Sequence, residues 1–186
     1  MYADNWAQKA KDKGYRSRAV FKLEEILKKT KIANCSNVLD LGSSPGGWSE
    51  YMIKKYPTSN VYAIDLIDME PIEGVAFFQD SIENLYNLEE ILKLKGCFKL
   101  VISDIAPNLS GISAVDSENI FNLNILTVKI ANDFLDSSGS MIMKTFQNSN
   151  LKTLRKNMEL SFKLVQTYKP AASKKQSGEI YLYGVK

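Results

Sequence analysis

The sequence predicts an α/β domain with a mostly parallel, seven-stranded sheet and helices on both of its faces. Short apolar runs alternate with segments of helical periodicity along the 186 residues, which favours parallel strands joined by crossover helices. Gly, Pro, Asn or Asp bounds each run, as is typical of strands. No helical segment separates the last two runs, so we expect them to form an antiparallel hairpin. With no internal repeat, residues 1–186 are expected to form one domain.

Each predicted element has a pattern of its own. Strands are expected in the apolar runs at 37–42, 61–66, 75–79, 99–105, 140–146, 162–169 and 179–185. Helical spacing of apolar residues predicts helices near 18–29, 47–55, 84–95 and 117–135. The first of these helices carries Val20, Leu23 and Leu27 on one face. The last one ends before Gly139, a residue type common just past helix C-termini.

Composition limits the chemistry that is open to the chain. It has no histidine, which excludes imidazole catalysis and most zinc sites. Cys35 and Cys97 are far apart and fit no metal-ligand spacing, so we expect no bound metal. No apolar run is long enough to span a bilayer, and no secretory signal is visible. We therefore expect an intracellular protein without a membrane partner, in the cytoplasm, a mitochondrion or the nucleolus.

Positive charge is concentrated at both ends of the chain. Residues 1–31 hold nine Lys or Arg against four Asp or Glu, and residues 163–186 hold five Lys against one Glu. The region between these ends is acidic. Such basic ends are expected either to hold a polyanion or to be solvated termini, and charge alone does not separate the two.

Lys144 is out of place in the apolar strand predicted at 140–146. A buried ammonium is costly unless it is paired or loses its proton. The position of Lys144 at the end of a strand suggests a function for it, because ligands of open α/β sheets bind at the edge where the parallel strands end. Gly42, Asp65 and Asp104 end three other predicted strands. We therefore expect these three residues and Lys144 to lie on one rim of the sheet.

The segment DLGSSPGGWSEY at 40–51 predicts a ligand-binding turn between the first strand and the next helix. Gly42, Gly46 and Gly47 permit a tight turn and a close approach of a ligand to the backbone, and the helix start can receive an anionic group. Asp65 follows Gly46 by nineteen residues, the usual place for an acid that binds ribose hydroxyls. A dinucleotide or S-adenosylmethionine fits this pattern. The spacing is not G-x-G-x-x-G, which argues against a dinucleotide and a nicotinamide oxidoreductase.

Six motifs, in this order, resemble those of the FtsJ/RrmJ-type ribose 2′-O-methyltransferases. They are GYRSRAVFKL, DLGSSPGGWS, DLIDMEPI, SDIAPNLSG, MKTFQ and KP…AS…GEIY, and the resemblance runs from about Lys9 to Val185. It implies a Rossmann-like fold that uses S-adenosylmethionine. The segments VLDLGSSPGGWS and DIAPNLSGISAVD look more like the branch that acts on ribosomal RNA than the branch that acts on the tRNA anticodon loop.

The resemblance also implies a binding site for S-adenosylmethionine across the strand ends. Gly46 and Trp48 would belong to the loop around the methionine part, and Asp65 would hold the ribose. Asp80 would lie at the adenine, and Asp104 would face the methionine end. The full set of cofactor-binding residues expected is Gly42, Ser44, Pro45, Gly46, Gly47, Trp48, Asp65, Leu66, Asp80, Ser81 and Asp104.

A catalytic Lys–Asp–Lys–Glu tetrad is the second feature that the resemblance implies, and its matching residues are Lys22, Asp104, Lys144 and Glu179. A ribose 2′-hydroxyl is a poor nucleophile while it keeps its proton, so the enzyme must position it and accept the proton. A lysine amine can accept a proton when desolvation or a nearby cation favours the neutral form. Lys144 is the expected acceptor, with its amine oriented by Asp104. Glu179 is expected to neutralise and orient Lys22.

RNA is the expected partner, held by the two basic ends of the chain. The side chains expected to contact it are Lys9, Lys13, Arg16, Arg18, Lys174 and Lys175. The resemblance implies methylation of a uridine of large-subunit ribosomal RNA, with the RNA inside the large ribosomal subunit. We expect the enzyme to be a monomer. Two alternatives stay open: the same reaction on the tRNA anticodon loop or a cap-type RNA end, and an RNA-binding ribosome-assembly factor that needs no turnover.

Overall fold

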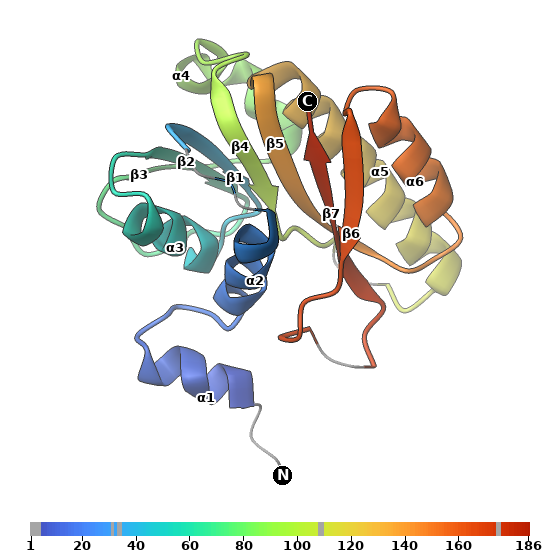
Figure 1. The fold of residues 1–186 in the computed structure, drawn as a ribbon, viewed down its shortest axis with the longest axis horizontal. Coiled ribbons are helices and arrows are strands. Elements are labelled where there is room, and N and C mark those ends of the chain that lie inside the picture. Colours follow the sequence, from blue (N-terminus) through green and yellow to red (C-terminus); the bar gives the residue numbers. More distant parts are fainter. Residues whose placement is uncertain (1–4, 31, 33–34, 108–109, 174–175) are drawn as a thin grey trace.

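A seven-stranded sheet forms the centre of the molecule (Figure 1). The computed structural model describes residues 5–30, 32, 35–107, 110–173 and 176–186. The strands are β1 (Asn37–Leu41), β2 (Asn60–Asp65), β3 (Val75–Gln79), β4 (Phe98–Ser103), β5 (Leu135–Phe146), β6 (Leu164–Tyr168) and β7 (Glu179–Val185). Their spatial order is β3-β2-β1-β4-β5-β7-β6, and only the pairs made by β7 are antiparallel. The predicted fold class, including the C-terminal hairpin, is confirmed.

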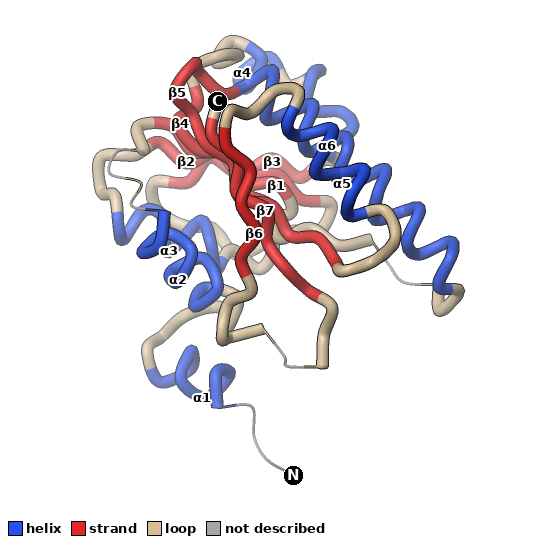
Figure 2. The backbone as a smooth tube through the Cα atoms, turned by 45° about the vertical axis from the view of Figure 1, so that its right-hand side comes forward, coloured by secondary structure: helices blue, strands red, loops and turns tan. Residues whose placement is uncertain are grey.

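Helices cover both faces of this sheet (Figure 2). They are α1 (Asn5–Asp12), α2 (Val20–Thr30), α3 (Gly47–Lys55), the 3₁₀ helix η1 (Ile82–Asn87), α4 (Glu89–Leu92), α5 (Ser113–Phe134) and α6 (Leu151–Glu159). Helices α2 and α3 lie on one face, and α5 and α6 lie on the other (Figure 2). Across the described ranges, no helix has the length and hydrophobicity needed to cross a bilayer.

Strand β5 shows why its sequence is apolar on both sides. Met141 and Met143 belong to the core beneath α5 and α6, whereas Ile142 belongs to the core beneath α2 and α3. Successive side chains of a strand point to opposite faces, so a central strand with helices on both sides must be apolar throughout. Lys144 extends this strand toward the edge where the parallel strands end.

The helix expected at 84–95 is wrong in type and length. Ser81 caps η1 by accepting a hydrogen bond from the backbone N–H of Glu83 at 3.2 Å. Leu88 is extended, with φ −83° and ψ 97°, and separates η1 from α4. The apolar spacing was nevertheless informative, because Leu85 and Ile91 are both fully buried.

Other differences concern two helices that were not predicted and two elements that begin earlier than expected. Helix α1 was not predicted, and it buries only Ala10. Helix α6 was not predicted either, because its buried stripe is limited to Leu154 and Met158. Strand β5 begins at Leu135 and runs through Gly139, earlier than expected. Helix α5 begins at Ser113, ahead of the expected start.

Candidate active site at the carboxyl ends of the strands

Gly42 allows the chain to turn sharply where β1 ends. Its φ is +75°, a left-handed conformation that residues with a Cβ rarely adopt. A Cβ at this position would lie 2.7 Å from the Cβ of Ile105, which follows β4. A glycine here therefore lets the exits of β1 and β4 meet closely at the rim of the sheet.

Asp65 connects the end of β2 to the glycine loop, the turn at residues 42–47 between β1 and α3. Its Oδ2 accepts a hydrogen bond from the backbone N–H of Ser44 at 2.8 Å, and its Oδ1 accepts one from the N–H of Ile67 at 2.8 Å. Both oxygens are thus held by backbone donors from two different loops. This arrangement fixes the carboxylate in one orientation at the mouth of the site.

Two adjacent cavities follow the strand ends. The larger, about 510 Å³, is lined among others by Gly42, Ser44, Asp65, Leu66, Asp80, Ser81 and Asp104. The smaller, about 180 Å³, is lined among others by Gly42, Ser44, Pro45, Gly47, Trp48 and Asp104. Gly46 is instead packed against the loop after β2, where a Cβ would lie 2.7 Å from Cδ1 of Ile72. The other residues expected at the cofactor therefore surround one continuous region at the rim.

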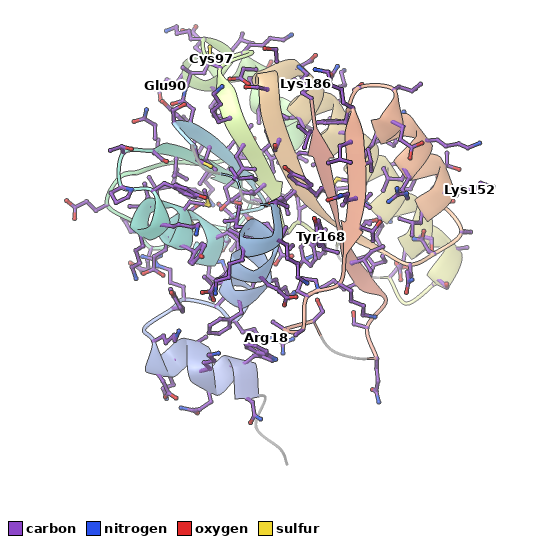
Figure 3. All side chains as sticks on the ribbon, in the orientation of Figure 1. Arg18, Glu90, Cys97, Lys152, Tyr168 and Lys186 are labelled. Atoms are coloured by element: carbon purple, nitrogen blue, oxygen red, sulfur yellow. The ribbon has the colours of Figure 1, made fainter. Side chains whose placement is uncertain are left out.

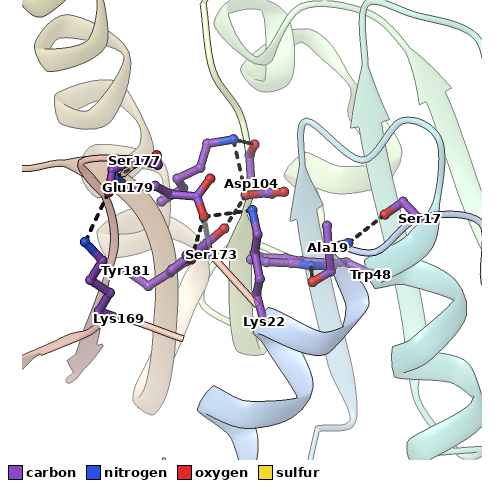
Figure 4. A network of polar contacts seen from close by, with 11 residues as sticks. Ser17, Ala19, Lys22, Trp48, Asp104, Lys169, Ser173, Ser177, Glu179 and Tyr181 are labelled. Atoms are coloured by element: carbon purple, nitrogen blue, oxygen red, sulfur yellow. Dashed lines mark hydrogen bonds and ion pairs between the residues drawn. The ribbon is translucent and has the colours of Figure 1, made fainter. Parts of the chain in front are cut away.

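The four charged residues of the expected tetrad form two ion pairs beside these cavities. The Nζ of Lys144 lies 3.2 Å from Oδ1 of Asp104 and also donates to the backbone carbonyl of Asp104. The Nζ of Lys22 lies 2.8 Å from Oε1 of Glu179. Figure 4 shows Lys22, Asp104 and Glu179 converging from α2, from the end of β4 and from β7. Residues far apart in the sequence thus meet at one place.

Both lysines of the tetrad are buried, and both have a carboxylate partner. The exposed fraction is 7% for Lys22 and 9% for Lys144. A buried charge without a partner would be strongly destabilising. Burial disfavours ionisation of Glu179, but the hydrogen bond and charge of Lys22, with help from Ser173 and Lys144, hold the pKa of this carboxyl below its usual value. Glu179 is therefore ionised at neutral pH.

Tyr181 joins this cluster, although the sequence analysis did not identify it. Its hydroxyl donates to Oδ1 of Asp104 at 2.7 Å, and it lies opposite Lys144 in the β5–β7 pairing. The Nζ of Lys22 lies 5.7 Å from the centroid of its ring. Burial, together with the charges of Asp104 and Glu179, raises the pKa of Tyr181 far above its usual value, so the hydroxyl stays protonated and remains a donor. The sequence could have pointed to Tyr181, because it lies two residues after Glu179 and therefore on the same face of the strand.

Asp40 is a second residue that the sequence analysis missed. It is 1% exposed, it lines the smaller cavity, and its Oδ2 accepts a hydrogen bond from Oγ of Ser49 at 2.6 Å. Burial raises the pKa of Asp40 to about 7; Ser49 opposes this shift, and the charges of Asp104 and Asp65 add to it. An acid inside the apolar strand NVLDL is the same anomaly that singled out Lys144, and it could have been found in the same way.

The basic side chains expected to contact RNA have varied surroundings. Lys9 and Lys13 lie over the ring of Phe21, with the nitrogens 5.1 and 5.9 Å from its centroid. Both guanidinium ends of Arg16 donate to backbone carbonyls. Arg18 lies between α1 and the rest of the molecule (Figure 3). Lys174 and Lys175 fall outside the described residues.

The two basic ends of the chain meet in space. The loop between β6 and β7 reaches α2, where the backbone N–H of Ala171 donates to Oε2 of Glu25 at 2.8 Å. In both backbone views this loop extends toward the side of the molecule that carries α1 (Figures 1 and 2). The first and last segments of the chain therefore flank the same side of the tetrad.

The fold, the glycine turn and the paired lysines and carboxylates define an α/β enzyme whose ligand site lies at the carboxyl ends of the strands. A sequence model of the FtsJ-like methyltransferases matches residues 15–186. The chain belongs to the FtsJ-like methyltransferase family.

Individual relatives agree with this assignment. The chain is 41% identical to the ribosomal RNA large subunit methyltransferase E of Dechloromonas aromatica, over 97% of this chain and 90% of the relative. It is 38% identical to the protein of the same name from Wigglesworthia glossinidia brevipalpis, over 99% and 92% of the two chains. A crystal structure assigned as a ribosomal RNA methyltransferase of Plasmodium falciparum superposes with a TM-score of 0.80 and 30% identity, covering 92% of this chain and 97% of that one.

Proposed function

We propose that this enzyme transfers a methyl group from S-adenosylmethionine to a ribose 2′-hydroxyl of RNA, with a uridine of large-subunit ribosomal RNA as the target. One observation carries the proposal: two buried lysines, each paired with a carboxylate, lie next to the cavities at the strand ends. The names of the relatives support the choice of large-subunit ribosomal RNA.

The residues around the cavities suit S-adenosylmethionine chemically. The cofactor carries a positive sulfonium and an ammonium group, and the smaller cavity is lined by Asp40 and Asp104. It also carries a ribose and an adenine, and the larger cavity presents Asp65, Asp80 and Leu66. Asp65 would hold the ribose hydroxyls, and Asp80 would lie at the adenine. When bound, the cofactor supplies an electrophilic methyl group.

Lys144 is assigned as the proton acceptor for the 2′-hydroxyl. Its amine is held by both the carboxylate and the backbone carbonyl of Asp104, so its position is fixed before substrate arrives. Such fixed placement is worth several kcal/mol in bringing a hydroxyl and a base together. The neutral amine of Lys144, formed when its ammonium releases a proton, would take the proton of the ribose 2′-hydroxyl.

Lys22 and Glu179 are assigned to the positioning of the ribose. Glu179 holds the ammonium of Lys22 through a charge-assisted hydrogen bond, and Ser173 donates to the same oxygen of Glu179 at 2.8 Å. An ammonium held in this way can donate to the ribose or stabilise negative charge on its oxygen as the proton leaves. Lys22 therefore complements the role given to Lys144.

RNA would be held by the basic ends that flank the tetrad. Helix α1 carries Lys9, and Lys13 follows its last residue, Asp12; the β6–β7 loop extends toward the same side of the molecule as α1 (Figures 1 and 2). Neutralised phosphates would supply affinity that falls as salt concentration rises. The enzyme is proposed to act as an intracellular monomer on ribosomal RNA that is already folded within the large subunit.

Transfer of labelled methyl groups tests the proposal directly. Wild type and Lys144→Ala are incubated with labelled S-adenosylmethionine and with large ribosomal subunits, naked ribosomal RNA or tRNA, and the modified ribose is mapped. Label is expected on one ribose of large-subunit RNA, and Lys144→Ala is expected to abolish it while S-adenosylmethionine still binds. Near-normal turnover by Lys144→Ala overturns the assignment of the base. Label on tRNA alone, or no label on any RNA, overturns the proposed substrate.

A further inference from the structure

Arg16 contacts two loops of the ligand site through its guanidinium group. Nη1 donates to the backbone carbonyl of Glu70 at 2.6 Å, and Nη2 donates to the carbonyl of Pro71 at 2.9 Å. Nη1 also donates to the carbonyl of Pro45, in the glycine loop, at 3.4 Å. The planar fork of an arginine suits two adjacent carbonyl oxygens, which a lysine cannot match. Arg16 thus joins the segment that follows α1 to two loops.

The loop at 66–73 that Arg16 holds is the direct continuation of Asp65. It returns to the glycine loop at several points: Oγ of Ser44 donates to the carbonyl of Asp68 at 3.5 Å, and Oγ of Ser43 contacts Sδ of Met69 at 3.8 Å. Gly46 completes the contact, because Ile72 fills the space that a Cβ would need. The two loops pack directly against each other beside the larger cavity.

The neighbours of Arg16 hold the glycine loop from the same side. Ser17 lies against Gly47, where a Cβ would be 2.7 Å from Oγ of Ser17. The indole N–H of Trp48 donates to the carbonyl of Ala19 at 2.8 Å, as Figure 4 shows. The segment 16–19 therefore packs along the glycine loop, and Arg16 extends this contact to the loop at 66–73.

We propose that Arg16 is a positioning residue for the cofactor, which acts by holding the loop at 66–73 against the glycine loop. This contact keeps the backbone N–H of Ser44 and that of Ile67 on the two oxygens of Asp65. The sequence favours a different role for Arg16, a contact with RNA phosphates. The proposal rests on the proposed function, since it takes S-adenosylmethionine as the ligand of this site.

Three single variants separate cofactor positioning from RNA contact. Arg16→Gln removes both the fork and the charge. Arg16→Lys keeps the charge and removes the fork. Lys13→Gln removes the same charge three residues earlier, just after α1, where the side chain lies over Phe21. For each variant, calorimetry gives the Kd for S-adenosylmethionine, filter binding gives the Kd for ribosomal RNA, and steady-state assays at saturating RNA give KM for the cofactor and kcat.

Loss of the fork is expected to weaken cofactor binding. Arg16→Gln should raise the Kd and KM for S-adenosylmethionine about tenfold, as expected for the loss of hydrogen bonds from a charged donor, and leave kcat at saturating cofactor within about twofold. Arg16→Lys should show an intermediate loss of cofactor affinity with unchanged RNA affinity. Lys13→Gln should weaken RNA binding and leave the cofactor Kd unchanged.

Two outcomes overturn the proposal. One is a cofactor Kd for Arg16→Gln within about twofold of wild type together with weakened RNA binding, which assigns Arg16 to RNA. The other is Arg16→Lys behaving as wild type in every measurement, which shows that the charge alone is needed. If Arg16→Gln does not fold, Arg16→Lys still tests the proposal. A wild-type protein that binds no S-adenosylmethionine contradicts the proposed function instead, so the two failures are distinguishable.

Discussion

Tyr181→Phe isolates one hydrogen bond at the centre of the proposed active site. The variant removes only the hydroxyl that donates to Oδ1 of Asp104 at 2.7 Å. The ring is fully buried against Trp48, with the ring centroids 5.9 Å apart, and phenylalanine keeps this packing. The change therefore acts on the carboxylate of Asp104 and, through it, on the amine of Lys144.

The size of the effect follows from the contacts of Asp104. A hydrogen bond to an ionised group contributes about 1.5–3 kcal/mol. Oδ1 of Asp104 also lies 3.2 Å from Nζ of Lys144, so it keeps one partner in the variant. The lower end of that range applies, and about 1.5 kcal/mol corresponds to roughly tenfold in rate. We expect Tyr181→Phe to lower kcat about tenfold.

Tyr183→Phe is the matched control for this variant. Tyr183 lies two residues further along β7, is also buried, and its hydroxyl contacts Oγ of Ser140 at 3.4 Å rather than Asp104. Single-turnover methyl transfer gives the rate, and calorimetry gives the Kd for S-adenosylmethionine. The cofactor Kd is expected to stay within about twofold for both variants, while only Tyr181→Phe loses rate. Equal rates for the two variants refute the role given to the Tyr181–Asp104 bond.

Three further predictions concern buried charge and the turn after β1. Because burial raises the pKa of Asp40 to about 7, the folded protein keeps this proton over a pH range in which the unfolded chain has already released it. The unfolding free energy of wild type should therefore fall between about pH 4 and pH 7, by at most ~1.4 kcal/mol per pH unit for this group. Asp40→Asn should remove this pH dependence of the unfolding free energy, measured by urea titrations at several pH values. An unchanged pH dependence contradicts the prediction. Glu179→Gln leaves Lys22 buried without its carboxylate and should cost about 3 kcal/mol of unfolding free energy at pH 7. Because the folded-state pKa of Glu179 is lowered, this difference should shrink as the pH falls below about 4.5; a pH-independent difference counts against the ion pair. Gly42→Ala places a Cβ 2.7 Å from Ile105 at a positive φ, so calorimetry should show lost cofactor binding and an unfolding free energy about 2 kcal/mol lower, whereas wild-type affinity rules out the proposed close contact.

The sheet was predictable because its physical requirements are local. A central strand buried on both faces must be apolar along its length, and a turn that needs a left-handed residue favours glycine there. Strands β1 and β7 and helix α3 accordingly lie within one residue of their predicted bounds. Short elements lack such a requirement, which explains why α1 and α6 were missed. In η1, the cap at Ser81 and the extended Leu88 decided between helix types, and periodicity does not report on either.

The expected site residues depended on two kinds of signal. Lys144 and Asp104 stood out because each is charged at the end of an apolar run, and parallel strands bring such ends together. Asp40 carried the same signal inside an apolar run and was overlooked. Lys22 and Glu179 had no such signal, and only the resemblance to a known family pointed to them. Arg16 was assigned to RNA from its charge, whereas its two carbonyl contacts depend on a loop more than fifty residues away.

The amino-acid sequence was sufficient to predict the α/β fold, the glycine turn and the rim on which Asp65, Asp104 and Lys144 lie, because the alternation of strands and helices along the chain depends on local patterns. How that rim is completed depends on contacts between distant segments. Strand β7 inserts between β5 and β6 rather than at the edge of the sheet, and its antiparallel register places Tyr181 opposite Lys144. Glu179 thereby reaches Lys22 of the first core helix. The Lys22–Glu179 contact joins residues more than 150 positions apart in the sequence, and it gives the buried ammonium of Lys22 a carboxylate partner.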